Sequence, residues 1–154
     1  MTNLCSEVLS ALAGKTLVTA ESLTGGGIGE AITSVSGASA VYCGGVISYT
    51  NQVKNRVLGV PEEILERYGA VSAWTAGYMA SGVRKLLRAD VAVSVTGLAG
   101  PGGDEYGNPV GTVFIGYEDA SHAEVRRFCF TGSREDVRRQ TIEAALKLIL
   151  ERNP

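Results

Sequence analysis

The chain has 154 residues, of which 45% are hydrophobic and 19% are charged, and its formal net charge is -2. This composition is globular and excludes an intrinsically disordered chain. The 14 basic residues are nearly balanced by 16 acidic ones, so neither a nucleic-acid partner nor an anionic membrane surface is expected. The length predicts a single domain over residues 1–154.

The three cysteines, Cys5, Cys43 and Cys129, have no framework spacing. We therefore expect buried free thiols in a reducing compartment rather than disulfides. The first residues include Glu7 and no basic stretch, unlike a signal peptide. No apolar run reaches the length of a membrane span. Together these features predict a cytoplasmic protein.

Hydrophobic periodicity and turn residues divide the chain into alternating helices and strands. The first half is predicted to form a helix at 3–13, a strand at 16–20, a helix at 24–35, a strand at 41–50, and short helices at 51–57 and 61–68. The second half is predicted to form a helix at 72–87 capped by Ser72, strands at 91–96, 110–117 and 124–130, and a last helix capped by Ser133. This order predicts an α/β fold with a mixed sheet, in which the last two strands are antiparallel. Val83, Leu86 and Leu87 are expected on the inner side of the long helix.

The chain lacks the residues of several common catalytic and cofactor sites. His122 is the only histidine and falls in a predicted surface turn, so we expect neither a Ser-His-Asp triad nor a zinc site. The Gly14-Lys15-Thr16 stretch lacks the first glycine of a P-loop and precedes a strand. No G-x-G-x-x-G follows the first strand, so no dinucleotide cofactor is predicted. A serine nucleophile would therefore need a base other than histidine.

The stretch V-T-A-E-S-L-T-G-G-G at 18–27 places Ser22 between a predicted strand and a run of glycines. Ligands of open α/β sheets bind at the carboxyl ends of strands. Backbone N–H groups from Thr24 through Gly25 and Gly26 to Gly27 could face an anion or a developing oxyanion there. Ser22 or Thr24 could instead simply cap the helix, and the residues alone leave both readings open.

Tyr49 and Lys54 follow the next predicted strand, with Y-x-x-x-x-K spacing. A lysine near a phenol and a serine can act as a general base if desolvation lowers its pKa. A surface lysine and a half-buried tyrosine are the ordinary alternative, so the pair by itself does not establish a site.

A third strand end carries T-G-L-A-G-P-G-G at 96–103. Thr96, Gly97, Ala99 and Gly100 are expected to present backbone N–H groups that suit a phosphate or a ribose. A glycine-rich turn without a ligand is the alternative. Two such strand ends in one small domain favour a shared cleft.

Five motifs, spread in order over nearly the whole chain, resemble the CinA C-terminal domain family. They are A-E-S-L-T-G-G at 20–26, G-G-V-I-S-Y-T-N-Q-V-K at 44–54, G-A-V-S at 69–72, T-G-L-A-G-P-G-G at 96–103 and P-V-G-T-V at 109–113. The resemblance implies a three-layer α/β/α fold with a five-stranded mixed sheet. It also implies a bacterial cytoplasmic enzyme, usually a homodimer, that recycles pyridine nucleotides.

Stand-alone members of this family are nicotinamide-nucleotide amidohydrolases of the PncC type, which convert nicotinamide mononucleotide to nicotinate mononucleotide and ammonia. The resemblance implies that Ser22 is the nucleophile and that Tyr49 and Lys54 assist it. The glycine-rich turn after Ser22 would stabilise the oxyanion, and no metal would be required. We expect the loop at 96–103 to hold the phosphate and ribose of the nucleotide.

Two other functions remain open from the sequence. The chain could be a non-catalytic module that binds a pyridine nucleotide, although the intact Ser22, Tyr49 and Lys54 count against it. It could also be an amidase for a different small carboxamide, sharing the chemistry and differing in the loop at 96–103.

Overall fold

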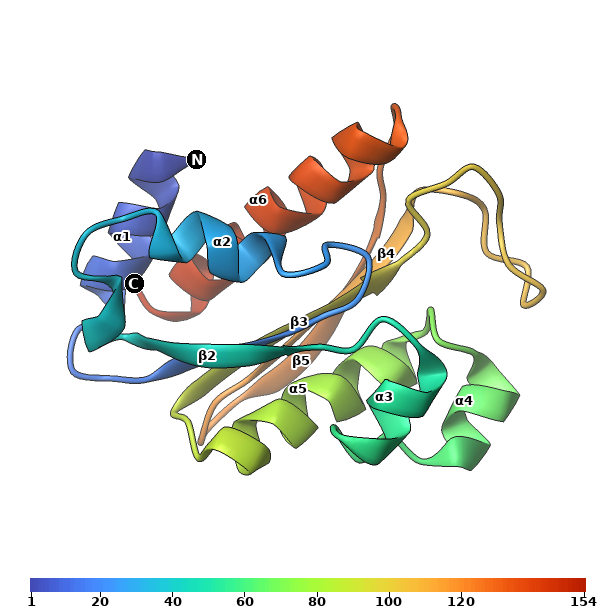
Figure 1. The fold of residues 1–154 in the computed structure, drawn as a ribbon, viewed down its shortest axis with the longest axis horizontal. Coiled ribbons are helices and arrows are strands. Elements are labelled where there is room, and N and C mark those ends of the chain that lie inside the picture. Colours follow the sequence, from blue (N-terminus) through green and yellow to red (C-terminus); the bar gives the residue numbers. More distant parts are fainter.

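The computed structural model describes all of residues 1–154 and contains one five-stranded sheet (Figure 1). Its strands are β1 (Leu17–Glu21), β2 (Tyr42–Ile47), β3 (Val91–Gly97), β4 (Thr112–Glu118) and β5 (Ala123–Cys129). They lie in the order β2-β1-β3-β4-β5. Strand β1 runs parallel to β2 and β3, whereas β4 is antiparallel to β3 and to β5. The predicted mixed sheet and its antiparallel last pair are confirmed.

Helices cover both faces of the sheet and complete three layers (Figure 1). Helices α1 (Thr2–Ala11), α2 (Gly27–Thr33) and α6 (Arg134–Arg152) lie on one face. Helices α3 (Asn51–Arg56), α4 (Glu62–Tyr68) and α5 (Ala73–Leu87) lie on the other. A short 3-10 helix, η1 (Ala38–Ala40), precedes β2. None of the helices is both long and apolar enough to cross a membrane.

The two layers of helices enclose two apolar cores, separated by the central strands. Successive side chains of a strand point to opposite faces, so Leu17 joins a cluster of 22 residues under α1, α2 and α6, whereas Val18 joins a cluster of nine under α4 and α5. All five residues of β1 are buried, as are the first six of β3. These strands therefore form a rigid base for the loops that leave their carboxyl ends.

Side-chain caps determine where α5 and α6 begin, as the sequence predicted. The Ser72 hydroxyl accepts the Thr75 N–H at 3.0 Å. The Ser133 hydroxyl accepts the Asp136 N–H at 3.2 Å, and the Asp136 carboxylate accepts the Ser133 N–H at 2.9 Å. This capping box satisfies two N–H groups that have no partner within the helix.

Two sequence predictions about burial are wrong. Leu86 and Leu87 are 51% and 41% exposed, because α5 ends there and the chain turns back at Arg88 with a φ of 52°. Cys43 and Cys129 are exposed, whereas Cys5 is buried as expected. The two exposed cysteines occupy outward-facing positions on β2 and β5, the edge strands of the sheet.

Candidate active site

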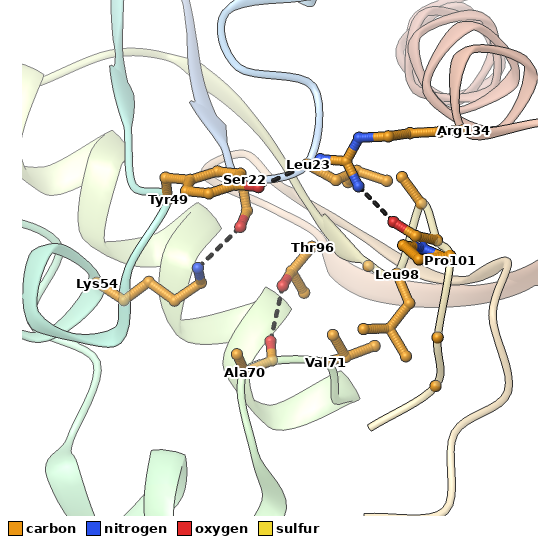
Figure 2. Close-up of a pocket in the computed structure, with 15 residues that line it drawn as sticks. Ser22, Leu23, Tyr49, Lys54, Ala70, Val71, Thr96, Leu98, Pro101 and Arg134 are labelled. Atoms are coloured by element: carbon orange, nitrogen blue, oxygen red, sulfur yellow. Dashed lines mark hydrogen bonds between the residues drawn. The ribbon is translucent and has the colours of Figure 1, made fainter. Parts of the chain in front are cut away.

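A cavity of about 440 Å³ opens where the parallel strands end. Ser22 follows β1, Tyr49 follows β2, and Thr96 and Gly97 end β3. The start of α6 contributes Arg134, whose guanidinium reaches toward Tyr49 (Figure 2). The predicted shared cleft at the strand ends is therefore present in the structure, and residues far apart in sequence line it.

Ser22 and Lys54 are in direct contact inside this cavity (Figure 2). The Lys54 Nζ donates to the Ser22 Oγ at 2.8 Å and to the backbone oxygen of Ser48 at 2.6 Å. Helix α3 is short, and its N-cap Thr50, which accepts the Val53 N–H, starts it directly after β2. This geometry turns the Lys54 side chain back under the end of the sheet.

The surroundings of Lys54 lower its proton affinity. Its side chain is 1% exposed, and no carboxylate forms an ion pair with it. Burial disfavours the charged form and lowers the pKa of Lys54 from 10.5 to about 8. Near neutral pH, part of the population therefore carries a neutral amine 2.8 Å from a hydroxyl group. Such an amine can accept the serine proton.

Tyr49 lies at the cavity but does not bond to the serine or the lysine. Its side chain is 60% exposed, and its hydroxyl accepts from the Arg134 Nη2 at 3.3 Å (Figure 2). The structure thus brings Ser22 and Lys54 together as a hydrogen-bonded pair and places the phenol of Tyr49 with Arg134 instead.

The glycine-rich turn after Ser22 differs from the sequence expectation. Helix α2 begins only at Gly27, and neither Ser22 nor Thr24 caps it. The buried Glu21 carboxylate accepts the Ile28 and Gly29 N–H groups at 2.8 and 3.1 Å. The protein's own carboxylate therefore occupies the N-terminus of α2, where an anionic ligand would otherwise be stabilised.

Thr24, Gly25 and Gly26 do not line the cavity. The Thr24 hydroxyl donates to Glu21 at 2.6 Å. The N–H of Gly25 bonds to the Ser22 oxygen, and the N–H of Gly27 bonds to the Thr24 oxygen. Of the expected row of free N–H groups from Thr24 to Gly27, those of Gly25 and Gly27 are thus used within the turn, whereas those of Thr24 and Gly26 have no acceptor in the protein.

The loop after β3 does line the cavity, through Gly97, Ala99 and Gly100 among others. Thr96 also lines it, although its hydroxyl donates to the backbone oxygen of Ala70 at 2.7 Å. The backbone N–H groups of Ala99, Gly100, Gly102 and Gly103 have no acceptor in the protein. Free N–H groups of this kind, on a loop without bulky side chains, can bind an anion.

Arg134 is the cavity residue that sequence reasoning missed. Its Nη1 donates to the Gly100 oxygen at 2.6 Å, so its guanidinium links the loop after β3 to Tyr49. The only sequence signal was its place directly after the predicted cap Ser133, and that signal does not indicate what the helix start faces. The cavity holds this cation and no carboxylate side chain.

No group of three or more histidine, cysteine, aspartate or glutamate side chains is arranged to hold a metal ion. The side-chain chemistry available in the cavity is therefore that of a serine, a desolvated lysine, a phenol and an arginine.

The chain matches known proteins over nearly its whole length. The family model for the CinA C-terminal domain matches residues 1–152. A CinA-like protein of Synechococcus is 46% identical over 152 residues, covering 96% of this chain and 36% of that protein. A CinA-like protein of Endomicrobium trichonymphae is 47% identical over 135 residues, covering 88% of this chain and 32% of the relative. The chain thus spans about a third of the length of the curated relatives it matches.

Solved structures with the same fold match nearly the whole chain. The competence damage-inducible protein A of Klebsiella pneumoniae is 38% identical, with a TM-score of 0.95, and the match covers 97% of this chain and 94% of that one. A CinA superfamily protein from Enterobacter cloacae is 33% identical, with a TM-score of 0.96, covering 99% and 92% of the two chains.

Proposed function

Because the chain belongs to the CinA C-terminal domain family, we propose that it is an amidohydrolase that converts nicotinamide mononucleotide to nicotinate mononucleotide and ammonia. The observation that carries the proposal is the 2.8 Å hydrogen bond between Ser22 and a buried Lys54 that has no ion-pair partner. A serine bonded to a desolvated lysine is suited to acyl transfer without histidine or metal.

The reaction would proceed in two stages through an ester. Neutral Lys54 takes the hydroxyl proton of Ser22 as the serine oxygen attacks the carboxamide carbon. The tetrahedral intermediate collapses, the C–N bond breaks, and the Lys54 ammonium returns its proton to the departing nitrogen, which leaves as ammonia. Water, deprotonated by Lys54, then attacks the ester, and Ser22 regains its proton as nicotinate mononucleotide is released.

The rest of the cavity suits the nucleotide part of this substrate. The guanidinium of Arg134 and the free N–H groups of the loop at 99–103 supply positive charge and hydrogen-bond donors for a phosphate. The absence of a cavity carboxylate avoids repulsion of that phosphate. We therefore assign this wall of the cavity to the phosphate and ribose, with the carboxamide directed toward Ser22.

The test is ammonia release from nicotinamide mononucleotide by the purified chain. We expect turnover by the unaltered chain and by Ser10→Ala, which changes an exposed serine on α1. Ser22→Ala should lower the rate at least about 10³-fold, because it removes the nucleophile.

Absence of turnover with this nucleotide would refute the assigned substrate. A panel containing nicotinamide, nicotinamide riboside and glutamine would then show whether the chain is an amidase for another carboxamide. Tight binding of the nucleotide, without ammonia from any compound, would favour the non-catalytic module instead.

A further inference from the structure

Three successive backbone carbonyl groups at the start of the turn, those of Ser22, Leu23 and Thr24, are held by hydrogen bonds from the protein. The Ser22 oxygen accepts the Gly25 N–H at 3.1 Å, and the Thr24 oxygen accepts the Gly27 N–H at 2.9 Å. Arg138 on α6 supplies the remaining contacts. Its Nε donates to the Leu23 oxygen at 3.0 Å, and its Nη2 donates to the Thr24 oxygen at 3.2 Å.

The N–H groups of the same turn are used differently. The Ser22 N–H donates to the Val95 oxygen at 3.1 Å, but the N–H groups of Leu23 and Thr24 have no acceptor in the protein. These two residues are only 5% and 1% exposed. Unpaired N–H groups in buried backbone are uncommon and call for an explanation.

The planarity of the peptide bond connects these two observations. In a trans peptide the C=O and the following N–H point in opposite directions. Because Arg138 holds the Leu23 oxygen, the Thr24 N–H points away from Arg138. In the same way, the bond from Gly25 to the Ser22 oxygen directs the Leu23 N–H away from that bond.

Helix α2 has no free N–H group at its start that could bind the substrate oxygen in place of the turn. The first N–H groups of α2, those of Ile28 and Gly29, are bonded to the Glu21 carboxylate. Gly26 also has a free N–H, but it lines a separate small hollow beside Tyr42 rather than the cavity. Thr24 does not line the cavity either, whereas Leu23 lines it and directly follows the nucleophile.

We propose that the N–H group of Leu23 is the oxyanion donor. The Gly25 N–H holds the peptide group that carries this donor, through the Ser22 oxygen, and Arg138 is the positioning residue that holds the next peptide group, through the Leu23 oxygen. This inference rests on the proposed acyl-transfer chemistry at Ser22. The residue that follows a serine nucleophile commonly supplies such a donor. When the carbonyl carbon of the substrate becomes tetrahedral, its negative oxygen would accept the Leu23 N–H group.

An arginine is suited to this role for a geometric reason. The Nε and Nη2 donors of a guanidinium are held rigidly in one plane, so one side chain can hold two successive carbonyl groups at once. Arg138 forms no ion pair, so its polar contacts in the protein are with these carbonyl groups. A lysine has a single nitrogen and lacks this fixed pair of donors.

The experiment compares Arg138→Met and Arg138→Lys with the control Arg139→Met. Arg139 is the adjacent, exposed arginine on the same helix and pairs only with Asp136. Three quantities are measured on each chain: kcat and KM for ammonia release, the second-order rate of Ser22 labelling by a fluorophosphonate, and the midpoint of thermal unfolding. The fluorophosphonate forms a tetrahedral phosphonyl ester and needs oxyanion donors but no nucleotide recognition.

We expect Arg138→Met to lower both kcat and the labelling rate about 10²–10³-fold, the range found when one oxyanion donor is lost, with KM changed less than about 3-fold. Arg138→Lys should fall between Arg138→Met and the unaltered chain, and Arg139→Met should match the latter. All rates are taken at least 15 °C below the unfolding midpoint of the least stable variant, so that unfolding does not contribute.

An unchanged labelling rate in Arg138→Met, or a raised KM with unchanged kcat, would overturn the inference. If the unaltered chain is labelled at Ser22 but releases no ammonia from the nucleotide, the proposed substrate fails, while the labelling rates still test the role of Arg138. If a fluorophosphonate does not label Ser22 in the unaltered chain, both proposals are rejected.

Discussion

Lys54 shows how burial can create a base at a single residue. A lysine side chain that is 1% exposed and has no carboxylate partner opposes folding as long as it is charged. Its pKa is about 8 in the folded chain and 10.5 in the reference state. The unfolded chain therefore binds more protons between these values, and stability rises with pH across that interval. Below about pH 8, the folded chain carries the cost of a buried ammonium group.

The same pKa predicts the pH dependence of the reaction. If Lys54 must be neutral to accept the proton of Ser22, kcat/KM should rise about tenfold in total between pH 7 and a plateau above about pH 9. The measurement is ammonia release from pH 7 to 9.5, above the range in which the substrate phosphate titrates. Circular dichroism at each pH checks that the fold is retained. A flat profile over this range would exclude Lys54 as the base.

The first two turns of α6 are the element that completes the site. Arg134 and Arg138 are four residues apart and so lie on the same side of the helix. Arg134 contacts the loop after β3, and Arg138 contacts the turn after β1. The capping box of Ser133 and Asp136 fixes where the helix begins, and therefore fixes both arginines relative to Ser22.

A double-mutant cycle on Tyr49 and Arg134 tests what this part of α6 does. The Tyr49 hydroxyl accepts from Arg134 at 3.3 Å and is exposed, so Tyr49→Phe should disturb only the position of the guanidinium and raise KM about 2–10-fold. Arg134→Gln should raise KM about 10–100-fold, the range for losing a hydrogen bond to a charged group. The double variant should resemble Arg134→Gln alone, because Tyr49 would act through the guanidinium. A large fall in kcat for Tyr49→Phe, additive with Arg134→Gln, would show that the phenol acts at Ser22 instead.

The position of α6 beside the cavity could not be predicted from the sequence. Periodicity and caps predicted the elements, and strand ends with the family motifs pointed to Ser22 and Lys54. Arg134 and Arg138 lie more than 100 residues from Ser22 in the chain, and no local pattern indicates that α6 packs against the turn after β1. Likewise, the letters A-E-S-L-T-G-G do not reveal that the Glu21 carboxylate folds back onto α2.

At the scale of the whole molecule, the cavity exists only in the folded chain. The residues that line it come from the ends of three strands, from α3, from the segment before α5 and from the start of α6. The first of them in the sequence is Ser22 and the last is Arg134. An unfolded chain cannot bring these segments together. A ligand of the cavity must therefore stabilise the entire fold and not just one loop.

Nicotinate mononucleotide, the expected product, provides the corresponding measurement. At 100 times its Kd it should raise the free energy of unfolding by about 2.7 kcal/mol, which corresponds to a rise of about 5–10 °C in Tm for a chain of this size. Ser22→Ala should keep this shift, because the serine is needed for chemistry and the proposed phosphate contacts come from Arg134 and the loop at 99–103. Arg134→Gln should lose most of it at the same concentration, because this guanidinium is the cation assigned to the phosphate. A Tm that does not respond to millimolar product would mean that the cavity does not bind the nucleotide, whatever reaction Ser22 performs.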